Sequence, residues 1–296
     1  MRSLPKAAAR PAAACDVRVS ATLGDKGLPA AWTHRVTGSS VLARFALPAF
    51  ANGLDRDAVE GAKDVPYTVP NVHVDHVRHE SPLATAFWRG VGPTHDIFVV
   101  ESFIDELAAK AGKDPVQYRL DLLDKAPRHK AVSQLAAAKA GRGTSMKAAA
   151  GGARTGRGVS VQFAFGSCMA QEVDVTVGKD GEVAVSRVVC AVDCGHVVNP
   201  DTVKAQVEGG VIFGITAALW REITFDKGRV VQSNFHDDRM LRMSEAPLIE
   251  VYTVPSTQLP GGLGETGTSP PWRRRWPTRC SRRRGRGYGS YRLRSR

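Results

Sequence analysis

The 296-residue sequence has no apolar run near the ~18 residues that a membrane-spanning helix requires, so we expect no membrane span. Residues 1–14 carry some positive charge but no apolar core of the length that an export signal needs. We interpret them as a disordered N-terminal segment without a targeting signal. The sequence therefore leaves the localisation unknown.

Cysteine is scarce, and the five cysteines form no C-x-x-C pair. This excludes the usual spacings of a zinc ribbon or an iron–sulfur ligand set. No cluster of His, Cys and carboxylate residues with ligand spacing is present either, so we expect no metal bound by side chains. Cys190 and Cys194 are expected to be packed thiols.

Acidic residues are absent from residues 272–296, which hold 11 arginines. The remaining residues contain 30 basic and 29 acidic groups, a net charge of about +1 against +12 for the whole chain. A nucleic-acid surface needs basic groups spread over a folded face, so we expect no nucleic-acid partner. Binding through the tail alone would be steeply salt-dependent and would disappear when the tail is deleted.

Hydrophobic periodicity predicts an α+β fold without internal repeats. Alternating residues predict strands over 17–23, 30–36, 65–77, 159–165, 170–177, 183–192 and 249–254. Helical spacing predicts helices over 94–108, 115–123, 131–140 and 203–219, with Asp114 and Asp201 as N-caps of the second and the last. Glycine-containing turns predict hairpins around 24–27, 178–181 and 226–228.

Residues 141–158 are rich in Gly, Ala, Lys and Arg and have no periodicity. This composition predicts a linker between a first portion, 15–140, and a second portion, 159–271. Residues 272–296 are expected to form a disordered tail, because arginines without acidic partners can bury almost nothing.

Residues 261–271, Gly-Gly-Leu-Gly-Glu-Thr-Gly-Thr-Ser-Pro-Pro, place Glu265 among glycines. Glycines allow a ligand to approach the backbone closely, and a poorly solvated carboxylate has the raised proton affinity that suits a general base. A glutamate in a surface turn would have the same local sequence, so both interpretations stay open at this point.

Several segments, in the same order along the chain, share a pattern with a known family. They are 87–95 (Phe-Trp-Arg-Gly-Val-Gly-Pro-Thr-His), 101–107, 112–115, 191–200 (Ala-Val-Asp-Cys-Gly-His-Val-Val-Asn-Pro), 206–210 (Gln-Val-Glu-Gly-Gly), 213–215 and 261–265. The later segments resemble the C-terminal half of the molybdopterin-binding subunit of the xanthine dehydrogenase and aldehyde oxidase superfamily. The earlier ones resemble, more narrowly, the large (beta) subunit of isoquinoline 1-oxidoreductase and its aldehyde-oxidising relatives.

The resemblance implies incomplete mixed-sheet molybdopterin-binding domains and a molybdenum–molybdopterin cytosine dinucleotide cofactor. The pterin, and not the protein, would then bind the metal. The implied reaction is oxidation of an N-heterocycle or an aldehyde, in which a molybdenum hydroxide attacks carbon and a hydride passes to the sulfido group. Glu265 matches the family's catalytic base.

The resemblance also implies cofactor-binding roles for Trp88, Arg89, Gly90, Gln206 and Gly264, and a place in the substrate pocket for Phe87. Alternatives remain: Arg89 could form a surface salt bridge, Phe87 could pack in a core, and Gln206 could lie at a helix start. We interpret His95 and His196 as structural.

Two departures from the family suggest a C-terminal fragment. The family's Gly-Gly-Gly-Phe-Gly and Met-Gly-Gln-Gly segments do not occur, and Arg-rich residues from Trp272 replace an apolar helix. G/C-rich codons for 272–283 give that apolar sequence in another frame, so we hypothesise a frameshift just before Trp272. The expected partners are the missing N-terminal half and a small 2Fe-2S subunit. The alternative function is a cofactor-free scaffold or binding protein of the same fold. Intact relatives are often exported to the periplasm by a twin-arginine signal, so the localisation could be periplasmic or cytoplasmic.

Overall fold

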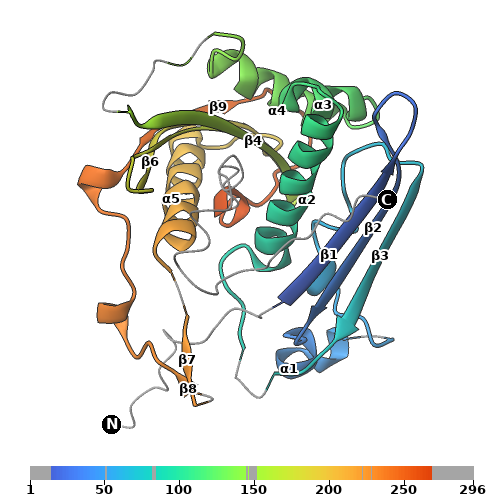
Figure 1. Ribbon diagram of the computed structural model, residues 1–296, viewed down its shortest axis with the longest axis vertical. Helices are drawn as coiled ribbons and strands as arrows, with labels where there is room; N and C mark the ends of the chain where they lie inside the picture. The colour runs from blue at the N-terminus through green and yellow to red at the C-terminus, as the bar shows by residue number, and fades with distance from the viewer. Residues whose placement is uncertain are drawn as a thin grey trace.

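The computed structural model describes residues 15–50, 52–81, 85–144, 146, 152–221, 223–227 and 229–268. The predictions for the N-terminal segment 1–14 and for the tail 272–296, including the frameshift hypothesis, lie outside these residues. Helices and mixed sheets alternate along the described chain, so the α+β class is confirmed (Figure 1).

A three-stranded sheet opens the fold. β1 (Cys15–Leu23) and β2 (Pro29–Gly38) form the predicted antiparallel hairpin, and β3 (Asn71–Arg78) pairs parallel with β2. β3 begins later than the predicted strand 65–77, because Pro66 and Pro70 lack the N–H groups that a ladder needs.

The helices follow, and their starts obey local rules. The short helix α1 (Leu42–Phe45) precedes β3, and α2 (Val91–Lys110), α3 (Pro115–Leu122) and α4 (Pro127–Lys139) come after it. The Asp114 side chain accepts hydrogen bonds from Val116 N at 2.9 Å and Gln117 N at 3.1 Å, so the predicted N-cap is confirmed. α2 packs on the first sheet through a core in which the rings of Trp32 and Phe103 meet edge to face at 5.0 Å.

The second sheet has the order β4-β5-β6-β9. β4 (Arg154–Ala164), β5 (Ser167–Val177) and β6 (Val183–Asp193) run antiparallel in turn, and β9 (Leu248–Thr253) is parallel to β6. β4 begins inside the segment predicted as a linker, because residues 154–158 pair with β5 despite their two glycines. The division into two portions stays a prediction.

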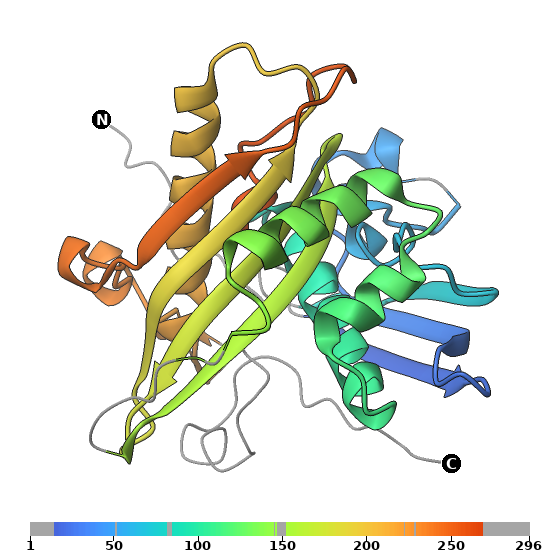
Figure 2. The same ribbon diagram turned by 90° about the horizontal axis from the view of Figure 1, so that it is seen from above.

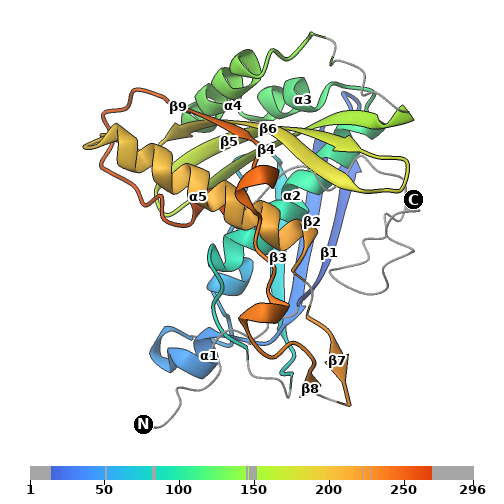
Figure 3. The same ribbon diagram turned by 90° about the vertical axis from the view of Figure 1, so that its left-hand side faces the viewer.

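α5 (Pro200–Leu219) covers one face of this sheet, and α4 covers the other (Figures 2 and 3). The prediction of Asp201 as the N-cap of this helix is wrong. Asn199 is the cap: its Oδ1 accepts from Asp201 N at 3.0 Å and from Thr202 N at 3.1 Å, with Pro200 in the first helical position. A small hairpin, β7 (Phe225–Asp226) and β8 (Arg229–Val230), follows where one was predicted.

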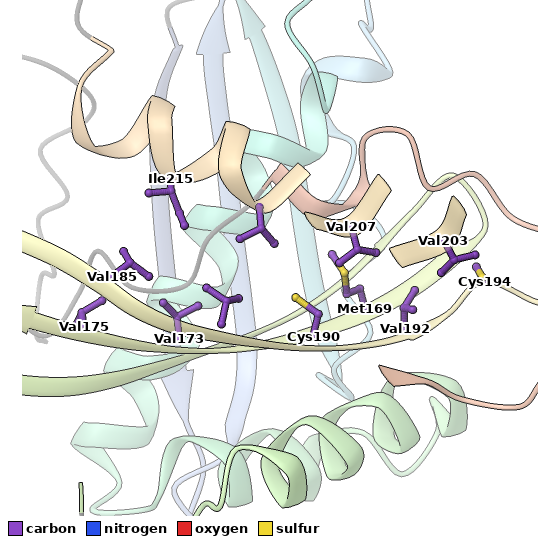
Figure 4. Close-up of a cluster of buried hydrophobic side chains, with 12 residues drawn as sticks. Met169, Val173, Val175, Val185, Cys190, Val192, Cys194, Val203, Val207 and Ile215 are labelled. Atoms are coloured by element: carbon purple, nitrogen blue, oxygen red, sulfur yellow. The ribbon is translucent and has the colours of Figure 1, made fainter. Parts of the chain in front are cut away.

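The largest core lies between α5 and the second sheet (Figure 4). Val203, Val207 and Ile215 of α5 face Met169, Val173 and Val192 of the strands. Cys190 and Cys194 are buried in the same cluster, so the prediction of packed thiols is confirmed, and burial raises the pKa of the Cys190 thiol. This core holds α5 firmly against the sheet.

Candidate functional site

Three segments that are distant in the sequence meet at one place. They are the loop before α2, the middle of α5, and the loop 261–268, whose last turn lies between α5 and α2 in Figure 1. Arg89 joins them, since its Nε donates to the Gly264 carbonyl at 2.8 Å and its Nη1 donates to the Gly209 carbonyl at 3.4 Å. Arg89 therefore bonds to backbone carbonyls of α5 and of the loop 261–268. These contacts do not support the interpretation of Arg89 as part of a surface salt bridge.

Glu265 lies at the N-terminus of α2. Its Oε2 accepts a hydrogen bond from Gly90 N at 3.3 Å, and Gly90 is the N-cap of the helix. The chain turns sharply here, with φ of 94° at Gly90 and 39° at Val91. The first N–H groups of a helix have no partner within the helix, so this end of α2 can donate to an acceptor from another segment.

The backbone around Glu265 is bare on one side and tightly packed on the other. A Cβ atom added to Gly264 or Gly209 would meet nothing within 4 Å. A Cβ on Gly210 would lie 2.9 Å from the Cα of Gly267, so α5 and the loop touch backbone to backbone. The open space beside the backbone of Gly264 and Gly209 leaves room for a ligand to approach these two glycines.

Aromatic rings lie beside Arg89. Trp88 stacks on Phe213 of α5, with ring centroids 4.8 Å apart. The guanidinium carbons of Arg221 and Arg89 lie 4.6 Å and 5.4 Å from the centroid of the Phe213 ring. Phe87 is 47% exposed, so the core-packing alternative does not hold for it.

Gln206 lies on α5, the helix whose Gly209 carbonyl Arg89 contacts. It is exposed and lies within α5, which begins at Pro200, so the helix-start alternative is wrong. It precedes Gly209 by one helical turn, which places it on the same side of α5 as the carbonyl that Arg89 contacts.

Sequence reasoning missed the buried amides that support the loop. Gln162 on β4 and Gln171 on β5 are 2% and 1% exposed. The Nε2 of Gln162 donates to the Thr266 carbonyl, and the Nε2 of Gln171 donates to the Gly267 carbonyl at 3.4 Å. Their only signal in the sequence is a polar residue inside an otherwise apolar strand, where a partner becomes necessary.

A second carboxylate, Glu60, lies near the site. Burial raises its pKa, and the charges of Asp57, of Asp64 and, least, of Glu265 act in the same direction, while Lys63 opposes them. Within the described ranges, no group of three or more His, Cys, Asp or Glu side chains could hold a metal ion. The same residues include no helix long and apolar enough to cross a membrane.

Comparisons with known proteins identify the class. Residues 101–247 match the model of a family described as a molybdopterin cofactor-binding domain. The chain is 34% identical over 262 residues to the beta subunit of isoquinoline 1-oxidoreductase of Brevundimonas diminuta, covering 87% of this chain and 33% of that one. It is 35% identical over 222 residues to a nicotinate dehydrogenase chain of Pseudomonas putida, covering 69% and 19%.

The fold is found in solved structures as well. Quinoline 2-oxidoreductase from Pseudomonas putida superposes with a TM-score of 0.71 at 12% identity, over 84% of this chain and 57% of that chain. The chain thus belongs to the molybdenum hydroxylase family of the xanthine dehydrogenase and aldehyde oxidase type, whose members are molybdenum-dependent oxidoreductases. It spans one third or less of the length of the two curated relatives named above.

Proposed function

We propose that this chain supplies the catalytic base and one wall of the active site of a molybdenum hydroxylase large subunit, with Glu265 as the base. The observation that carries the proposal is the placement of Glu265. Its carboxylate meets the N-terminus of α2 at Gly90, beside bare backbone at Gly264. Arg89 ties this loop to α5.

The described residues fit one side of a molybdenum–molybdopterin cytosine dinucleotide. The open backbone at Gly264 and Gly209 leaves space for a flat group. Arg89 has five N–H donors, of which the two hydrogen bonds to Gly264 and Gly209 use only part, so it retains donors for an anionic group. Gln206, with its amide on the exposed side of α5, and Trp88 complete the proposed cofactor contacts. When bound, the cofactor would supply the oxygen-transfer and redox chemistry.

Each side chain has a distinct role in this proposal. Glu265 accepts a proton, and the hydrogen bond from Gly90 N at the N-terminus of α2 orients its carboxylate. Arg89 stabilises negative charge that develops on the substrate, since its guanidinium is fixed by two carbonyls and loses little freedom. Phe87, an exposed aromatic residue two positions before Arg89, forms part of the substrate pocket in this proposal.

The substrate class and the partners come from the relatives. Relatives named for isoquinoline and nicotinate oxidation support an N-heterocycle as substrate, and one named as an aldehyde dehydrogenase supports an aldehyde. The isoquinoline and nicotinate relatives are each named as one subunit of an enzyme, which supports an enzyme assembled from several chains. We propose that the partners are the N-terminal part of a large subunit and a small 2Fe-2S subunit that accepts the electrons.

The test is to co-express the full chain with the remaining two thirds of the isoquinoline relative's beta subunit and a small subunit. Metal analysis measures bound molybdenum, and released cytidine monophosphate identifies the dinucleotide. Glu265→Gln should keep the molybdenum content and lower kcat for isoquinoline by about 10²-fold to 10⁴-fold. Glu182→Gln, at an exposed turn between β5 and β6, is the matched control and should change neither.

Two outcomes would contradict the proposal. Turnover by Glu265→Gln at the level of the control would exclude the base role. Wild-type complexes without molybdenum would instead favour a binding protein that has kept the fold and lost the cofactor.

A further inference from the structure

Two threonine hydroxyls connect the Arg89 loop with the Glu265 loop. Thr94 Oγ1 donates to the Arg89 carbonyl at 3.1 Å, and Thr268 Oγ1 donates to the Glu265 carbonyl at 2.9 Å. The two hydroxyl oxygens are 3.3 Å apart. A continuous path of polar contacts therefore joins the backbone of the proposed base to the backbone of the arginine.

The three contacts have different reach along the chain. The two carbonyl contacts each lie within one loop, since Thr94 is five residues from Arg89 and Thr268 is three residues from Glu265. The contact between the two hydroxyls joins residues 174 positions apart, and either oxygen can be its donor. This contact therefore links the two loops.

Gly90 makes room for this pair. A Cβ on Gly90 would lie 2.0 Å from Thr94 Oγ1 and 2.4 Å from Thr268 Oγ1, so the hydroxyls occupy the place of a side chain. Thr268 is 2% exposed, and a buried hydroxyl without partners would be destabilising. The same Gly90 donates its N–H to the Glu265 carboxylate. The hydroxyl pair and the contact to the carboxylate therefore share one residue.

We infer that Thr94 and Thr268 are positioning residues, whose hydroxyls fix the two loops so that the Gly90 amide meets the Glu265 carboxylate. The catalytic part of this inference rests on the proposed function, and the structural part does not. A carboxylate displaced by about 1 Å loses its alignment with substrate, and such displacements lower rates by up to about 10²-fold. Substrate binding depends on other contacts, so the effect falls on kcat.

The test compares Thr268→Val, which keeps the shape of the side chain and removes the hydroxyl, with Thr268→Ser, which keeps the hydroxyl. Hydrogen exchange by mass spectrometry on the full chain reports the peptides that contain Gly90 and Glu265, independently of activity. We expect Thr268→Val to exchange at least tenfold faster in both peptides, and Thr268→Ser to match the wild type. Thr253→Val, at an exposed position of β9, is the control and should exchange as the wild type does.

In the assembled enzyme, Thr268→Val should lower kcat by about tenfold to a hundredfold with little change in KM, and serine should restore it. Equal behaviour of the valine and serine variants, or wild-type exchange at Gly90 in Thr268→Val, would overturn the inference. Failure of the proposed function gives a different result. In that case, Glu265→Gln retains turnover while the exchange difference between valine and serine persists.

Discussion

Glu172 on β5 offers a sharp test of how burial and ion pairing compete in this fold. The residue is 2% exposed, and its Oε1 accepts from Arg142 Nε at 3.3 Å. Its Oε2 has no hydrogen-bond partner among the described residues. Burial raises the pKa of Glu172 from 4.5 to about 7, even though the charges of Arg142, Arg157 and Arg119 act to lower it.

The magnitude follows from linkage between protonation and folding. One pKa unit corresponds to about 1.4 kcal/mol, so the shift is worth about 3 kcal/mol. Because the folded-state pKa is raised, the folded chain holds more protons than the unfolded chain between pH 4.5 and about 7. This contribution to stability is complete below pH 4.5 and is lost as the pH rises through about 7.

Glutamine at position 172 imitates the protonated carboxyl at every pH. We therefore expect Glu172→Gln to match the wild type near pH 4 and to be more stable by about 3 kcal/mol at pH 8. Urea unfolding followed by far-ultraviolet circular dichroism at several pH values measures the difference. Glu182→Gln, which is exposed, should show no such trend.

The opposite sign at pH 8 would refute the reasoning. If Glu172→Gln is less stable than the wild type there, the ion pair with Arg142 outweighs the cost of burying the carboxylate. Glu172 would then be charged in the folded state at this pH.

Two further pairs of substitutions test the site backbone and the core. Gly90→Ala should destabilise the chain by about 1–3 kcal/mol in urea unfolding, because its Cβ would overlap two hydroxyls at a φ of 94°. In Gly264→Ala the new Cβ meets no neighbour, so the free energy of unfolding should change by less than about 0.5 kcal/mol, while the molybdenum content of the assembled enzyme should fall. Equal losses of stability in Gly90→Ala and Gly264→Ala would contradict the packing described for the loop. Ile215→Ala, at a residue 1% exposed between α5 and the second sheet, should cost about 2–5 kcal/mol. Val198→Ala, at a residue 84% exposed, should cost almost nothing, and a similar cost for both would show that α5 does not pack as described.

Local rules predicted most of the elements from the sequence. The hairpin of β1 and β2 and the Asp114 cap depend on residues a few positions apart, and both are confirmed. The cap of α5 was missed although Asn199-Pro200 repeats the Asp114-Pro115 pattern, so the same rule applied to this pair predicts it. β4 was predicted too short because the glycines at its start hide the alternation.

The site was predictable in part. A shared motif singled out Glu265 and Arg89, but the contact between Arg89 and Gly264 joins residues 175 positions apart. No local pattern specifies such a contact. Gln162 was missed for the same reason, since its partner, the Thr266 carbonyl, is 104 positions away. Thr94 and Thr268 bond to nearby carbonyls, but the contact between their two hydroxyls joins residues 174 positions apart, and only the tertiary fold makes it.

The two carbonyl contacts of Arg89 have a thermodynamic consequence. One guanidinium bonds to α5 at Gly209 and to the Glu265 loop at Gly264, so a shift of the helix changes the energy of the loop. Anything that binds the outer side of α5 and moves it is then coupled to whatever binds beside Glu265. Since such coupling is reciprocal, occupation of the loop must alter the affinity of the helix surface by the same factor.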